Sequence, residues 1–248
     1  MANKKAKQAP KALAIVLIVL GVTIIGLAAW FIVGAARGEN QPENLPSSSN
    51  ITVEPVEAPE IENKAFMDGL VTVEKVSRYA GIFVEDGSDE IVSDVFAITV
   101  VNNSDKMLQY AQVTITCGSE TYTFDMSTIP AGARAQVLEK DKKALPEDLS
   151  GAQTVLTTVT EFQEAPSLYA DIFEFAPSEY SVGIKNVSKS DITGDIYVYY
   201  KTKVGDLYMG GITYRAKVTD LAAGEEKSAY ASHFFGSDSE ILFVTYAK

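Results

Sequence analysis

Cysteine and histidine are almost missing from this chain, which has one of each, Cys117 and His233. A single cysteine cannot form a disulfide bond within the chain. Secreted mammalian proteins built from tandem β-sandwiches usually carry disulfides, so this lack favours a bacterial surface protein. We interpret Cys117 as a small apolar strand residue and not as half of a Cys–His dyad.

Catalytic motifs are missing too. The sequence has no P-loop, no dinucleotide-binding glycine pattern, no Ser-x-x-Lys and no HExxH. No nucleophile elbow presents a serine to His233 for a Ser-His-Asp triad. We therefore expect no enzymatic activity, no catalytic residue, no cofactor and no metal-dependent chemistry.

Basic residues are few, with 21 Lys and Arg against 33 Asp and Glu and a net charge of −12. Five of the basic residues precede Gly38, whereas every acidic residue follows it. This excess of negative charge excludes nucleic acid as a partner, because nucleic acid needs a basic surface. It favours solubility and cationic partners.

A long uncharged segment covers residues 12–36 and predicts a transmembrane helix. As a helix it is about 37 Å long, enough for a hydrocarbon core of about 30 Å. The lysines in the tail 1–11 predict a cytoplasmic N-terminus and extracytoplasmic C-terminal domains. The alternative is a cleaved signal peptide, although its apolar region is usually shorter.

Residues 37–65 predict an extended linker. Four prolines disfavour helix, and acidic residues replace the large apolar side chains that a core needs. Such a segment spaces the following domains from the membrane by at most about 90 Å.

The remaining sequence repeats itself, which predicts two tandem domains, 66–163 and 164–248. The matching strings, in the same order in both copies, are YAGIF (79–83) and YADIF (169–173), ITVVNNS (98–104) and VGIKNVS (182–188), IPAG (129–132) and LAAG (221–224), and LSGAQTVLTTVT (149–160) and FFGSDSEILFVT (234–245).

Short runs rich in Val, Ile, Thr, Tyr and Phe alternate in both copies, and turn residues separate them. Such runs are typical of half-buried strands. About seven strands in 90 residues predict an all-β fold with two β-sandwich domains. The strand ends and turns VVNNS (100–104), IKNVS (184–188), IPAG and LAAGEE (221–226) resemble the FxLYD-type, immunoglobulin-like modules of bacterial membrane-anchored surface proteins. The resemblance implies immunoglobulin-like sandwiches that act as spacers or binders.

A group of aromatic and glycine residues in the second copy is the candidate partner-binding patch, for a protein or a cell-surface polymer. Its members are Tyr197, Tyr199, Tyr208, Gly210, Gly211 and Tyr214. Tyr197 and Tyr199 share one face of a strand, opposite Ile196, Val198 and Tyr200. The glycine pair predicts a bulge or the close approach of another chain. The alternative is a cross-strand aromatic ladder without a partner.

Two other features have alternative interpretations. The acidic loop 85–90 is either a calcium site or a solvated turn. The Asn-x-Ser sequences at Asn102 and Asn186 recur at one repeat position, which turn chemistry explains without a glycan.

These observations favour a single-pass membrane protein whose extracytoplasmic domains bind, adhere or assemble. The alternative is a ligand-sensing or regulatory accessory ectodomain for a cell-envelope enzyme or transporter.

Overall fold

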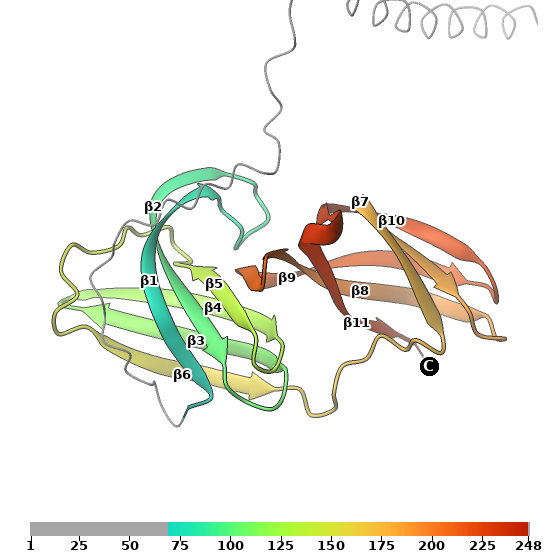
Figure 1. The fold of residues 1–248 in the computed structure, drawn as a ribbon, viewed down its shortest axis with the longest axis horizontal. Helices are drawn as coiled ribbons and strands as arrows, with labels where there is room; N and C mark the ends of the chain where they lie inside the picture. Colours follow the sequence, from blue (N-terminus) through green and yellow to red (C-terminus); the bar gives the residue numbers. More distant parts are fainter. Residues whose placement is uncertain (1–68, 248) are drawn as a thin grey trace, which may run out of the picture. The chain divides into compact units, whose positions relative to one another are not determined.

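The computed structural model describes residues 69–247, and these residues form β-strands joined by turns, with one short 3-10 helix (Figure 1). The predicted all-β fold is therefore confirmed for this part of the chain. The predicted tail 1–11, helix 12–36 and linker 37–65 all precede it and lie outside the described part. Among residues 69–247 no helix has the length and apolarity to cross a membrane.

Six strands make up the first copy, which we call the first repeat. They are β1 (Val71–Ile82), β2 (Ile91–Asn102), β3 (Leu108–Cys117), β4 (Glu120–Ile129), β5 (Arg134–Leu138) and β6 (Gln153–Glu161). Alternate residues of β4 point inward, among them Tyr122, Phe124 and Met126. They meet inward side chains of β2 and β5, so the core lies between one layer with β1, β2 and β5 and another with β4, β3 and β6.

Five strands make up the second repeat. They are β7 (Phe173–Asn186), β8 (Ile192–Val204), β9 (Leu207–Leu221), β10 (Glu226–Phe235) and β11 (Ser239–Tyr246), with the 3-10 turn Gly236–Asp238 before the last. Its core contains Ile184 of β7, Phe234 of β10 and Ile196 of β8. The two-stranded sheet of β10 and β7 thus packs over the strands β9, β8 and β11.

The two repeats have the same strand pairing. In the first, β2 pairs with β5, and β3 pairs with both β4 and β6. In the second, β7 pairs with β10, and β8 pairs with both β9 and β11. All six pairings are antiparallel. The repetition in the sequence therefore corresponds to a repetition of structure.

One buried asparagine closes the same turn in each repeat. The Asn102 amide donates to the carbonyl of Ile129 at 2.9 Å, and the Asn186 amide donates to that of Leu221 at 3.0 Å. Each amide also donates to the carbonyl four residues farther along the chain. Both side chains are buried, so these Asn-x-Ser sequences serve the turns, as the turn interpretation expects.

Strand β7 folds back on itself. A Cβ atom added to Gly183 would lie 2.8 Å from the carbonyl oxygen of Ala176. A straight strand would separate these residues by about 23 Å. Near the ends of this pair the Val187 N–H donates to the Ile172 carbonyl at 2.8 Å. The first part of β7 therefore lies beside its second part, as β1 lies beside β2.

The YAGIF and YADIF strings are not equivalent in structure, although their similarity suggests that they are. YAGIF (79–83) ends β1, whereas most of YADIF (169–173) precedes β7. The Asn103 N–H donates to the Leu70 carbonyl, which is the contact that Val187 and Ile172 make in the second repeat. The first repeat thus has a long β1–β2 hairpin, with the acidic loop at its tip, where the second has a short turn.

One sheet passes through both repeats, in the strand order β1-β2-β5-β9-β8-β11 (Figure 1). Strands β5 and β9 join the two halves and are parallel, with Arg134 opposite Leu207 and Gln136 opposite Met209. The joining strand β9 carries the glycine pair that the sequence singled out. The candidate site therefore includes the place where the two repeats meet.

Candidate functional site at the junction of the two repeats

The part of β9 that reaches the first repeat has no counterpart in β4. Ile129 and Leu221 occupy the same position in the two turns, so the first residue of β4, Glu120, corresponds to Ile212. The segment 207–211, LYMGG, precedes this point and is an addition of the second repeat. We call it the docking segment.

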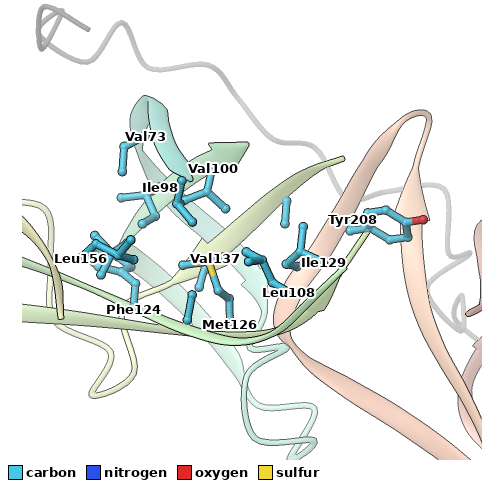
Figure 2. Close-up of a cluster of buried hydrophobic side chains, with 14 of the residues drawn as sticks. Val73, Ile98, Val100, Leu108, Phe124, Met126, Ile129, Val137, Leu156 and Tyr208 are labelled. Carbon is cyan, nitrogen blue, oxygen red and sulfur yellow. The ribbon is translucent and has the colours of Figure 1, made fainter. Parts of the chain in front are cut away.

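The docking segment places side chains in the cores of the first repeat. Tyr208 is 4% exposed and belongs to the cluster that contains Leu108 and Phe124. Figure 2 shows Tyr208, carried by β9, at one end of that cluster. Met209 is buried in a smaller cluster with Phe83 and Leu138. The first repeat therefore completes its apolar core with residues of the second.

Glycine is required at position 211 by the close approach of β4. A Cβ atom there would lie 1.8 Å from the carbonyl oxygen of Asp125. At Gly210 the backbone has φ +81°, and an added Cβ would meet Val84 at 2.9 Å. The Ser127 hydroxyl donates to the Gly211 carbonyl at 3.1 Å. The close approach expected at this pair is made by the first repeat of the same chain.

A bulge in β9 follows the docking contact. The register between β8 and β9 passes from Tyr200 opposite Tyr214 to Thr202 opposite Met209. Residues 210–213 therefore lie opposite the single residue Lys201, three more than a regular ladder would place there. The carbonyl groups of Gly210, Gly211 and Ile212 turn toward Lys201.

Lys201 is fully buried inside this bulge. Its ammonium group donates to three consecutive carbonyl groups, those of Gly210 at 3.1 Å, Gly211 at 3.1 Å and Ile212 at 2.5 Å. Burial lowers the pKa of Lys201 from 10.5 to about 7, while the nearby charge of Glu85 opposes this change. An ammonium has three donors, and here each has an acceptor.

Glu85, from the acidic loop of the first repeat, is the acid beside this lysine. One carboxylate oxygen accepts the Leu138 N–H at 2.8 Å, and the other accepts the Gly211 N–H at 2.7 Å. Burial raises the pKa of Glu85 from 4.5 to about 7, although these N–H groups and the charge of Lys201 lower it. One carboxylate thus bridges a strand of each repeat.

A second contact joins the acidic loop to the second repeat. The His233 Nε2 atom lies 3.0 Å from a carboxylate oxygen of Asp89, and its Nδ1 lies 2.9 Å from the Ser232 hydroxyl. The imidazole stacks on Tyr214, with ring centres 4.2 Å apart. Although serine, histidine and aspartate meet here, Ser232 is the neighbour of His233 in strand β10 and not the tip of a nucleophile elbow.

The enclosed pair is suited to holding the repeats together. A buried amine whose pKa lies near 7 is nucleophilic in principle. Lys201, however, has no exposed surface at which to meet a substrate, and its three donors are in use. What the arrangement can do is fix the docking segment by bonds in a dry environment, where each is stronger than in water.

The six residues of the predicted patch fall into two groups. Tyr208, Gly210, Gly211 and Tyr214 lie together at the junction. Tyr199 is stacked on Phe243, which belongs to the first repeat's core cluster. Tyr197 lies on the same face of β8, beside Arg215 and Lys217, and its hydroxyl donates to Asp195. As expected, Ile196, Val198 and Tyr200 face the opposite, buried side.

The acidic residues of the loop 85–90 have partners within the protein. Asp86 and Glu90 form ion pairs with Lys142, and Asp89 contacts His233. No three side chains suited to hold a metal ion come together anywhere in residues 69–247. Cys117 donates to the carbonyl of Asp148 and takes no part in the junction.

Sequence reasoning did not find the pair of Glu85 and Lys201. Lys201 alternates with Tyr197 and Tyr199, a pattern that places it on the outer face of a strand. The available signal was the difference between the copies: the acidic loop occurs only in the first and the longer tyrosine–glycine hairpin only in the second. The acidic loop and the tyrosine–glycine hairpin contact each other in the structure.

Comparison with known proteins adds no family. A scan against protein-family models finds no match for this chain, and no curated protein matches it.

Proposed function

We propose that this chain is a single-pass, membrane-anchored surface protein that binds or assembles with a partner and performs no catalysis. Its two immunoglobulin-like β-sandwich domains act as one arm, carried by the linker 37–65 and the helix 12–36. The observation that carries this proposal is the junction, where the features that distinguish the two repeats are buried against each other.

The junction supports a mechanical role for the arm. Domains in one chain usually meet through modest polar interfaces and move relative to each other. Here a sheet continues from β5 into β9, and Tyr208 completes the core of the first repeat. Such a joint resists hinge motion, so a surface on the second repeat is held at a defined distance from the first. An adhesion or scaffold subunit needs that property.

The titratable groups support a role without chemistry. An active site brings such groups together in a cleft that a substrate can enter. Glu85 and Lys201, an acid and a base whose pKa values are both strongly shifted, are instead held by backbone groups of both repeats. Their perturbed pKa values are explained by burial at a joint.

The membrane topology can be tested with single cysteines. We would replace Cys117 with serine and place one new cysteine at Ser119, in the exposed turn between β3 and β4, or at Ala2. A membrane-impermeant maleimide added to intact cells should label the Ser119→Cys chain and spare the Ala2→Cys chain. Equal labelling of both before lysis would refute the orientation, and release of the chain by alkaline carbonate would refute the anchor.

Tyr197 is a half-buried member of the predicted patch that lies beside two cations, Arg215 and Lys217, and makes none of the junction contacts described above. We expect the Tyr197→Ala chain to recover less partner than wild type in a pull-down with full-length protein. Val204→Ala, a change at an exposed apolar residue of the same strand, is the matched control. Equal recovery by all three proteins would remove Tyr197 from the binding surface.

A further inference from the structure

The outer edge of β10 corresponds to the edge of β5 that the docking segment covers. The Asn102 N–H donates to the Ala133 carbonyl, and the Asn186 N–H donates to the Glu225 carbonyl, so Ala133 and Glu225 are equivalent. The strands that follow them, β5 and β10, are equivalent as well. Strand β5 lies between β2 and β9, whereas β10 pairs only with β7 in the part of the chain that the structure describes.

An exposed tyrosine marks the same place on the uncovered strand. Leu138 is the fifth residue after Ala133 and Tyr230 is the fifth after Glu225. Leu138 is 1% exposed, in a cluster that contains Met209 of the docking segment and apolar residues of the β1–β2 hairpin. Tyr230 is 79% exposed, more than any other large hydrophobic side chain in the described residues. The second repeat thus presents an aromatic ring where the first repeat has a covered apolar contact.

The neighbouring strand extends this surface. Tyr230 lies opposite Ser181 of β7. The residue before Ser181, Tyr180, is 41% exposed and packs edge-on against Phe235. A two-stranded sheet with an unpaired edge is a template on which another strand can add. Aromatic rings beside such an edge give apolar area to that strand.

The charges beside the edge indicate the partner's charge. Exposed acidic residues on β10, on the part of β7 that pairs with it and on the 3-10 turn are Glu179, Glu226 and Asp238. Two lysines lie on these strands. Lys185 of β7 is opposite Glu226, and the ammonium of Lys227 donates to the carbonyls of Thr219 and Asp220. A strand with basic residues at its ends therefore fits better than an acidic one.

We propose that the outer edge of β10 receives an extended strand of another protein by β-strand addition, with an apolar residue against Tyr230 and basic residues at its ends. This inference rests on the proposed binding function and names its surface and partner class. A second copy of this chain is a poorer donor, because each copy's docking segment is engaged at β5 and two chains of net charge −12 repel each other.

The probe is a pair of fluorescein-labelled peptides that copy residues 207–214 (LYMGGITY) between two lysines or between two glutamates. Each is titrated into purified full-length chain and followed by fluorescence anisotropy. The lysine-flanked peptide should bind at least threefold more tightly than the other at low salt. Tyr230→Ser should weaken its binding at least tenfold. Ile91→Ser, at an apolar residue that is 74% exposed, should leave binding unchanged.

Three outcomes overturn the proposal. The first is no binding of either peptide at millimolar concentration, and the second is equal weakening by Tyr230→Ser and Ile91→Ser. The third is self-association in analytical ultracentrifugation that Tyr230→Ser abolishes, since the occupant would then be a second copy. None of these results bears on the anchor or on Tyr197, so the proposed function is judged separately by its own labelling and pull-down tests.

Discussion

Lys201 and Glu85 show at the scale of single residues how the junction is held. Lys201 is fully buried and Glu85 is partly buried, and together they bond to backbone groups of β5 and β9. Removing one member of a buried charge pair leaves the other without compensation and usually costs about 3–5 kcal/mol. The two residues therefore act as one unit, and each is expected to be intolerant of substitution alone.

Lys201→Met should lower the free energy of unfolding by about 3 kcal/mol, because three carbonyl groups lose their donor and Glu85 loses the nearby positive charge. Lys203→Met is the matched control two residues away. Lys203 forms a partly exposed ion pair with Glu240 at 2.7 Å, so we expect a loss below about 1 kcal/mol. Urea unfolding of the full-length chain measures both, and equal losses would contradict the role of Lys201.

The pair should also impose a characteristic pH dependence. The pKa of Glu85 is raised from 4.5 to about 7, so its contribution to stability is complete below pH 4.5 and is lost as the pH rises to about 7. The pKa of Lys201 is lowered from 10.5 to about 7, so its contribution is complete above pH 10.5 and is lost as the pH falls to about 7. The junction should be weakest near neutral pH.

The double variant Glu85→Met/Lys201→Met isolates this effect, since both proteins share every other titrating group. The free energy of unfolding of wild type minus that of the variant should pass through a minimum near pH 7, measured by urea unfolding at pH 5, 7 and 9. A difference that stays constant with pH would show that the pair does not titrate in this range.

Asn102→Ala should cost about 3 kcal/mol, because its buried amide donates to the carbonyls of Lys106, Ile129 and Pro130. Asn103→Ala removes one exposed hydrogen bond, to Thr72, and should cost less than about 1 kcal/mol. Thermal unfolding of the two variants gives the comparison. Similar melting temperatures would mean that the turn does not depend on the buried amide.

Among the elements, β9 decides how the repeats meet. Its docking segment pairs with β5, its glycine pair lies against β4, and its bulge surrounds Lys201. A bulge of this kind interrupts the ladder and redirects the strand. Beyond Tyr214 the same strand pairs regularly with β8. The first part of β9 therefore contacts the first repeat, and the second part belongs to the sheet of the second repeat.

Gly211→Ala should destabilise the protein by about 3 kcal/mol, since the new Cβ would overlap the Asp125 carbonyl oxygen. Gly205→Ala in the β8–β9 turn is the control. Gly205 has φ +64° with no atom near the added Cβ, so only backbone strain of about 1 kcal/mol is expected. Urea unfolding ranks the two, and the reverse order would contradict the close approach of β4 and β9.

The strands and the duplication could be predicted because both depend on short stretches of sequence. Alternation in β8 places Ile196 and Val198 inward, and the buried turn asparagines recur at one repeat position. The structural equivalence of YAGIF and YADIF was wrong, because YAGIF ends the first strand of its hairpin whereas YADIF leads into the first strand of the other. The burial of Lys201 could not be predicted. It depends on the acidic loop, which is distant in the sequence, and on a bulge that appears only in the pairing of β8 with β9.

At the scale of the whole described region, the two repeats share one sheet and part of one core. Phe243 of β11 stacks on Tyr199 and meets Phe162 edge-on just after β6, so the contact extends beyond β9. A chain joined in this way cannot unfold one repeat without exposing apolar surface of the other. We therefore regard residues 69–247 as a single cooperative unit.

Scanning calorimetry of the full-length chain tests this claim most directly. We predict one transition in which the calorimetric and van't Hoff enthalpies agree. Tyr208→Ala should shift it to lower temperature, because a second-repeat residue then leaves a cavity in the first repeat's core, at a cost of about 3–5 kcal/mol. Two separate transitions in the wild-type protein, with Tyr208→Ala moving neither, would contradict the account.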